Sequence, residues 1–189
     1  MQSHNWFVRH IVTVKKPKGF IFLCKFKEVK EMEAGISTLG ITFGYGVEST
    51  AGTKPSTFTK LNRINNIAGI TIEPEQLDAS ALEDAVTRYV KGRADTGGSF
   101  PVTVNFTPET KTEWETLITA YKELSGGKRM WFETIIPGFE DAFFVVAQPP
   151  EQIPQPEFAQ NGLLTIDFNL TIEEYKGMEA KVAFTTSGS

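Results

Sequence analysis

Two segments of the chain alternate between apolar and polar or small residues, and this period of two constrains the fold more than any other feature. The first segment, LGITFGYGV, places Leu39, Ile41, Phe43, Tyr45 and Val47 on one side. The second, LLTIDFNLTIEE, does the same with Leu164, Ile166, Phe168, Leu170 and Ile172. A β-strand with one buried face has this period, whereas a helix repeats every 3.6 residues. Both segments are therefore predicted to be half-buried strands.

The rest of the chain adds further strand patterns and one helix. Strands are predicted within residues 58–72, 100–106, 128–138 and 141–148, and the residues after Val182 are predicted to fray. The helix is predicted from Thr107 as N-cap, with Pro108 at the first helical position, to the Gly126-Gly127 pair. Its core face is predicted to consist of Trp114, Leu117, Ile118 and Tyr121. The fold class is therefore mainly β with one α-helix, an antiparallel β-sandwich or small barrel with a long inter-strand loop.

The composition gives little support to catalysis, metal binding or cofactor binding. The chain has 189 residues with a single cysteine, Cys24, and two histidines, His4 and His10. It contains no phosphate-binding glycine loop and no His/Cys cluster, so we predict no enzyme, no metal and no cofactor. Paired carboxylates remain as candidates for glycosidase-like chemistry, but adjacent pairs are mostly solvated surface. These pairs are Glu83-Asp84, Glu140-Asp141 and Glu173-Glu174.

Aromatic residues cluster in two of the predicted strands and allow two interpretations. Trp131, Phe132, Phe143 and Phe144 suggest either a sugar-binding platform or core packing. Core packing is the commoner role of such residues, and we favour it.

The first 31 residues differ from the rest in charge, with seven basic and two acidic residues. A signal peptide, a basic arm or an added strand are alternatives, but the apolar stretch GFIFLC is short for a signal peptide. The codons for Lys27-Glu28-Val29 can contain the ribosome-binding sequence AAGGAGG, a short distance before Met32. We therefore interpret residues 1–31 as a translated upstream leader of a bacterial or bacteriophage gene. Residues 32–189 are then one domain with 12 basic and 21 acidic residues, a net charge of −9.

A long, charged segment, Leu77–Gly98, separates two predicted strands and needs an explanation. Ser80 and Glu83 match a capping box and Gly92 can end a helix, so a short helix lying on the sheet is one hypothesis. The other is an extended arm that contacts a neighbouring subunit. In that case Arg88, Lys91 and Arg93 form a local cationic patch on an acidic chain.

The region from Thr71 to Leu117 resembles the central part of the major tail proteins, or tail tube proteins, of long flexible-tailed bacteriophages and prophages of Gram-positive bacteria. The resemblance rests on an ordered series of elements: Asp78-Ala79-Ser80, then Tyr89-Val90 with Gly92, then Asp95 with Gly97, and a strand ending at Asn105 before the helix. The segments MEAGISTLGITFGYG and NLTIEEYKGMEAKV also resemble members of that family.

The resemblance implies a structural virion protein that self-assembles into stacked hexameric rings, the tube through which DNA reaches the host. Its partners would be further copies of itself, the tape-measure protein, the tail terminator and the distal tail or baseplate proteins. DNA would be in transit only, and no membrane would be bound. The protein would lie in the virion tail, and in the bacterial host cytoplasm during assembly.

The long segment would then be the assembly loop, with these residues at subunit contacts: Leu77, Asp78, Leu82, Arg88, Tyr89, Val90, Lys91, Arg93 and Asp95. The alternatives are a type VI secretion-like tube, another tail-ring component, or a carbohydrate-binding virion β-sandwich.

Overall fold

The computed structural model describes residues 35–185. The proposed leader, residues 1–31, lies outside the described residues. The chain divides into two units, Met1–Ile36 and Ser37–Ser189, and the second contains all the described strands and the helix.

Ten strands and one helix follow each other along the described chain. The first five strands are β1 (Thr42–Val47), β2 (Phe58–Leu61), β3 (Ile64–Ile67), β4 (Glu73–Asp78) and β5 (Tyr89–Asp95). The strand β6 (Ser99–Asn105) leads into the helix α1 (Pro108–Lys122). The last four strands are β7 (Met130–Ile135), β8 (Asp141–Gln148), β9 (Thr165–Ala180) and β10 (Phe184–Thr185).

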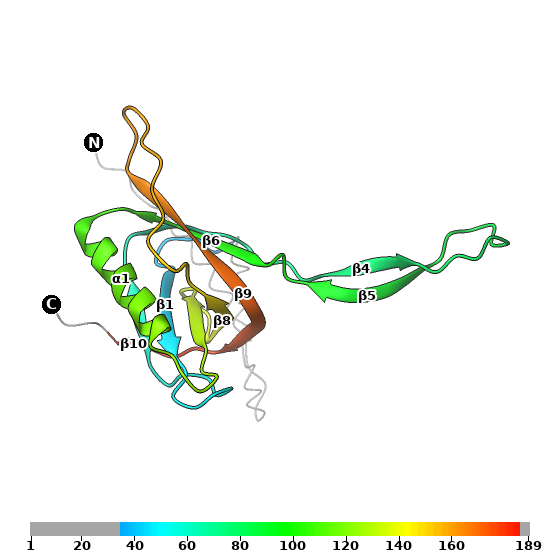
Figure 1. Cartoon of the computed structure of the whole chain (residues 1–189), viewed down its shortest axis with the longest axis horizontal. Helices are drawn as coiled ribbons and strands as arrows, with labels where there is room; N and C mark the ends of the chain where they lie inside the picture. The colour runs from blue at the N-terminus through cyan, green and yellow to red at the C-terminus, as the bar shows by residue number, and fades with distance from the viewer. Residues whose placement is uncertain (1–34, 186–189) are drawn as a thin grey trace, which may run out of the picture. The chain divides into compact units, whose positions relative to one another are not determined.

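Eight of the strands form one sheet that curls into a half-barrel, in the order β10-β2-β1-β7-β8-β9-β6-β3 (Figure 1). All its pairs are antiparallel except β10 with β2. The long strand β9 pairs with β6 in its first half and with β8 over the remainder, with irregularities near Gly177. The predicted fold class, mainly β with one helix, is confirmed. The strands β4 and β5 form a separate two-stranded sheet.

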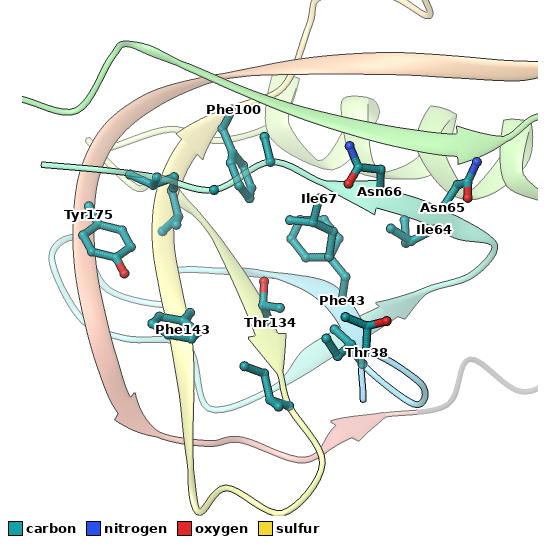
Figure 2. Close-up of a pocket in the computed structure, with 16 residues that line it drawn as sticks. Thr38, Phe43, Ile64, Asn65, Asn66, Ile67, Phe100, Thr134, Phe143 and Tyr175 are labelled. Carbon is teal, nitrogen blue, oxygen red and sulfur yellow. The ribbon is translucent and has the colours of Figure 1, made fainter. Parts of the chain in front are cut away.

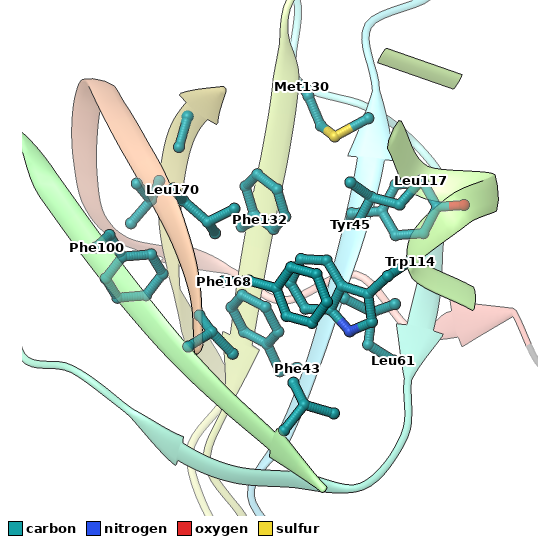
Figure 3. Packing of buried hydrophobic residues seen from close by; sticks show 14 of the residues in the cluster. Phe43, Tyr45, Leu61, Phe100, Trp114, Leu117, Met130, Phe132, Phe168 and Leu170 are labelled. Atoms are coloured by element: carbon teal, nitrogen blue, oxygen red, sulfur yellow. The ribbon is translucent and has the colours of Figure 1, made fainter. Parts of the chain in front are cut away.

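The main hydrophobic cluster lies between one face of the sheet and α1 (Figure 3). Trp114 stacks on Phe168 of β9, with ring centroids 3.7 Å apart. Trp114, Leu117 and Ile118 are buried, and Tyr121 is half-buried at the edge of the cluster. Thr107 is the N-cap of the helix, and its hydroxyl accepts a hydrogen bond from the Thr110 backbone N–H at 3.2 Å. These contacts fix α1 to the sheet.

A second, smaller cluster lies on the opposite face of the sheet. Phe58, Trp131 and Phe144 are buried there, and Phe184 packs against them. The glycines of β1 make room for these rings, because a Cβ on Gly44 would lie 2.5 Å from the ring of Phe184. The expectation that the chain frays after Val182 is wrong for residues 184–185, which pair with β2 as β10.

Candidate assembly surface

The segment Leu77–Gly98 contains most of a β-hairpin that leaves the eight-stranded sheet (Figure 1). Its strands β4 and β5 pair antiparallel, with Leu77 opposite Val90 and Asp78 opposite Tyr89. The alternative of a short helix over Ser80–Gly92 is therefore wrong. A helix over this segment would be stabilised only by burying its apolar stripe, and Leu82, Val86 and Tyr89 of that stripe are exposed.

The tip of the hairpin, residues 79–88, is held by local hydrogen bonds. Ser80 accepts a hydrogen bond on its hydroxyl oxygen from the Arg88 backbone N–H at 2.8 Å, so it closes the hairpin instead of capping a helix. The Asp78 carboxylate accepts one from the Ser80 backbone N–H at 2.9 Å. Hydrogen bonds from the Ser80 side chain and backbone lower the pKa of Asp78. The carboxylate of Asp84 accepts a hydrogen bond from Ala81 N–H at 3.0 Å and lies 3.9 Å from the Arg88 guanidinium.

Gly92 and Asp95 shape the rest of the hairpin. Pairing shifts by one residue between Pro74 and Gln76, so β5 bulges near Gly92. A Cβ on Gly92 would lie 3.0 Å from the carbonyl oxygen of Glu75, a contact that a larger side chain would turn into a clash. At the base, the Asp95 carboxylate accepts a hydrogen bond from Gly97 N–H at 3.0 Å, where the chain turns back into β6. The motif residues thus make the hairpin rather than a chemical site.

The hairpin exposes large apolar side chains. At the tip, Leu82 is fully exposed and Val86 is 74% exposed. Along the strands, Tyr89 is 63% exposed, and Leu77 and Val90 form a half-exposed cross-strand pair. Exposed apolar residues gathered on one element mark an interaction site more often than isolated ones do.

The charges of the hairpin differ from the cationic patch that we expected. Lys91 and Arg93 lie on β5 and Arg88 closes the tip, but residues 73–95 also contain six acidic side chains, so the formal charge of the hairpin is −3. Lys91 lies opposite Gln76 of β4, and Arg88 lies 3.9 Å from Asp84 of the same tip, so the basic residues do not form a separate cationic surface. The apolar residues are therefore the stronger feature for recognition.

A groove of about 580 Å³ lies on the α1 side of the sheet, between β3 and the strands β7 and β8 (Figure 2). We call it the β3 groove. Its 16 lining residues include Ile64, Ile67, Ile70, Phe143 and Tyr175, and none of the 16 carries a charge. The sequence patterns did not predict a groove at this place. The uncharged stretch INNIAGI, residues 64–70, was its only signal.

Two buried glutamates lie elsewhere in the sheet, and the first is fully hydrogen-bonded. The carboxylate of Glu48 accepts hydrogen bonds from the N–H groups of Gly52 at 2.8 Å, of Arg129 at 3.1 Å and of the Trp131 indole at 2.8 Å. Arg129 also pairs with Glu174 at 2.8 Å. Burial alone would raise the pKa of Glu48, but the hydrogen bonds and the Arg129 charge outweigh it and lower the pKa. This network joins the end of β1 and the start of β7 to the middle of β9, and its role is structural.

The second buried glutamate, Glu133, has only one hydrogen bond. It accepts from the Val182 backbone N–H at 2.7 Å, and its other carboxylate oxygen has no partner among the described residues. Burial raises its pKa, an effect that the hydrogen bond and the nearby Lys54 only partly offset. Glu133 thus fixes the segment before β10 to the sheet.

The candidate chemical sites are not brought together in the described part of the chain. Glu83-Asp84 lies at the hairpin tip and Glu140-Asp141 at the start of β8. On β9, Glu173 accepts a hydrogen bond from the Gln148 side chain, and Glu174 forms ion pairs with Arg129 and Lys176. No group of three or more potential metal ligands occurs among the residues described. Within the same residues, no helix is long and apolar enough to cross a membrane.

The aromatic residues considered for a sugar platform are mainly core. Trp131, Phe132 and Phe144 are buried, and Phe143 is half-buried in the wall of the β3 groove. The preference for core packing over a sugar platform agrees with this burial.

Comparison with known proteins identifies the fold. No protein-family model matches the chain, and no curated protein matches it. Among solved structures, it is similar to a chain from the cryo-EM structure of an extracellular contractile injection system, the PVC sheath/tube terminator in its extended state. The TM-score is 0.54 at 18% identity, covering 78% of this chain and 99% of that chain. The chain therefore shares its fold with that chain.

A second solved structure shows a weaker likeness, which carries no argument. It is the baseplate of the anti-feeding prophage, with a TM-score of 0.48, 12% identity, and coverage of 79% of this chain and 98% of that chain.

Proposed function

We propose that this chain is a structural subunit of a phage tail or tail-like assembly, one that builds stacked hexameric rings as the tail tube. The single observation that carries the proposal is the β4–β5 hairpin, which leaves the sheet and presents Leu82, Val86 and Tyr89 to solvent. Six subunits per ring is what the resemblance to the tail tube proteins implies.

The hairpin suits ring assembly for a physical reason. Burying one exposed Leu, Val or Tyr side chain contributes about 1.5–3 kcal/mol, so three of them drive association well. A hairpin that contacts a different surface of the next copy makes a head-to-tail interface, and such interfaces close into rings or continue as filaments. The residues proposed for subunit contacts are those of the assembly loop named above, with the apolar ones dominant.

The acidic charge supports a role as a DNA conduit. Residues 32–189 have a net charge of −9, and a negative wall repels the phosphate backbone. A basic wall would instead bind DNA through counterion release. DNA would therefore pass through the tube without a binding site on this chain, and the chain would have no catalytic role.

The main alternative is a ring that ends the tube rather than forms it. It is favoured by the likeness to the sheath/tube terminator structure. As a tube protein, the chain would contact the tape-measure protein inside the tube and the terminator and distal tail or baseplate proteins at its ends. It would lie in the virion tail after assembly in the host cytoplasm.

The test is negative-stain electron microscopy of the purified full chain at low and high concentration. A chain beginning at Met32 serves as a parallel sample for the leader hypothesis. Long hollow tubes support the tube subunit, and single six-fold rings support the terminator-like alternative. A protein that stays monomeric at high concentration, alone and with tail-tip components, contradicts both.

Variants at the hairpin tip show whether the hairpin drives assembly. The double variant Leu82→Ser/Val86→Ser is expected to abolish tubes or rings. The matched control Leu82→Met/Val86→Ile keeps apolar side chains at both positions and is expected to assemble. If the serine variant assembles as well as the control, the hairpin does not carry the proposed function.

A further inference from the structure

We infer that the hairpin tip of one copy inserts its apolar residues Leu82 and Val86 into the β3 groove of a neighbouring copy. This inference rests on the proposed function and names the surface that receives the hairpin.

The two surfaces match in chemistry. The tip presents the fully exposed Leu82 and the largely exposed Val86, and the groove is lined by Ile64, Ile67 and Phe143 without a charged residue. Its volume of about 580 Å³ lies in the range of pockets that enclose whole ligands, so it has room for two aliphatic side chains. Apolar side chains entering an uncharged groove remove water from both surfaces and leave no charge unpaired.

The polar groups around the contact also fit. Asn65 and Asn66 are exposed on β3 at one end of the groove, and Figure 2 shows their side-chain amides there. Glu83 follows Leu82 in the tip and makes no ion pair with another described residue. An amide N–H donates to a carboxylate, so Asn65 and Asn66 form a suitable polar rim for Glu83.

The geometry of the chain requires the occupant to be a second copy. Ile70, in the groove wall, lies three residues before β4, so the groove is at the base of the hairpin. Strand β4, from Glu73 to Asp78, covers about 16–17 Å at roughly 3.3 Å per residue, and the tip with Leu82 follows it. A paired hairpin does not fold back over that length, so the tip of one copy reaches the groove of another.

Each copy then supplies one tip and one groove. The same contact repeats from copy to copy in a head-to-tail order, which generates a ring or a filament without any other component. The β3 groove is thus the acceptor half of the interface, and the hairpin tip is the donor half.

Disulfide trapping tests the contact. In a Cys24→Ser full chain, we would combine Leu82→Cys with Gly69→Cys. Gly69 lines the groove, and a Cβ there meets no atom within 4 Å, so the substitution leaves the fold undisturbed. Oxidation of the assembled protein is expected to give a ladder of dimers and higher multimers on a non-reducing gel. The matched control, Leu82→Cys with Thr112→Cys on the exposed face of α1, is expected to give no ladder.

A second variant fills the groove without introducing a thiol. Gly69→Phe is expected to raise the concentration needed for assembly at least tenfold, whereas the size-matched control Thr112→Phe, on the exposed face of α1, is expected to leave it unchanged. Far-UV circular dichroism and the urea midpoint of the monomer check that both variants fold.

The outcomes separate the two proposals. If the trapping variant assembles but positions 82 and 69 do not crosslink, or if Gly69→Phe assembles like Thr112→Phe, the groove is not the acceptor and the proposed function stands. If the parent chain never assembles, the proposed function fails and this inference fails with it.

Discussion

Replacing the buried Glu48 by glutamine is expected to destabilise the fold by about 2–4 kcal/mol. One carboxylate oxygen of Glu48 accepts from Gly52 N–H and Arg129 N–H, and the other from the Trp131 indole and the Arg129 side chain. Glutamine keeps one acceptor oxygen and turns the other into an NH₂ group that faces two donors. Each buried donor left without an acceptor costs about 1–3 kcal/mol, and the partly exposed Arg129 side chain lies at the low end, which gives the range stated.

Glu133→Gln is the matched control, because it makes the same chemical change at another buried site of the same sheet. Glu133 accepts one hydrogen bond, from Val182, and the glutamine carbonyl keeps it. The charge of Glu133 is not well compensated, as the raised pKa indicates. We therefore expect Glu133→Gln to be as stable as the parent protein at neutral pH, or more stable.

The pH dependence of the two variants should be opposite in sign. The pKa of Glu48 is lowered by folding, so its contribution is present above the unfolded pKa of about 4.3 and is lost as the pH falls through the folded value. The pKa of Glu133 is raised, so its ionisation removes stability as the pH rises from about 4.3 through the folded value. The deficit of Glu48→Gln should shrink in acid, and the advantage of Glu133→Gln should grow towards neutral pH.

The assay is urea unfolding of monomeric protein between pH 3.5 and 7.5, followed by tryptophan fluorescence. With a slope of about 2 kcal/mol per M urea, a loss of 3 kcal/mol lowers the midpoint by about 1.5 M. Equal midpoints for the two variants at pH 7, or free-energy differences that do not change with pH, would refute the reasoning.

Three further predictions concern packing. Trp114→Ala removes the ring stacked on Phe168 and should cost about 3–5 kcal/mol in urea unfolding, since it leaves a large cavity. Gly92→Val should speed hydrogen exchange of the hairpin amides and leave the urea midpoint unchanged, because its side chain meets the Glu75 carbonyl at the bulge; an unchanged exchange rate would contradict this. Phe184→Ala uncovers the second cluster and should lower the free energy of unfolding by about 2–4 kcal/mol, and a change below 1 kcal/mol would mean that β10 contributes little.

Local sequence patterns are sufficient to predict the elements in which pattern and burial agree. The alternation of residues 164–172 places Ile166, Phe168 and Leu170 in the core of β9, and the Thr107-Pro108 start gives the helix its observed N-terminus. These predictions succeeded because a period of two or 3.6 selects one buried face, and the observed core uses that face.

Other features were decided only by contacts between distant residues. Phe184 becomes part of a strand because it packs over Gly44, which precedes it by most of the chain, and no local pattern encodes that contact. The β3 groove exists because the sheet curls and brings Ile67 near Phe143.

The β4–β5 hairpin depends both on local sequence signals and on contacts between strands. Its turn residues, Asp78, Ser80 and Gly92, are readable in the sequence, but they fit a capped helix as well as a hairpin. Strand pairing distinguishes them, because the pairing of Leu77 with Val90 satisfies the backbone while Leu82 and Val86 stay exposed instead of covering a helix face.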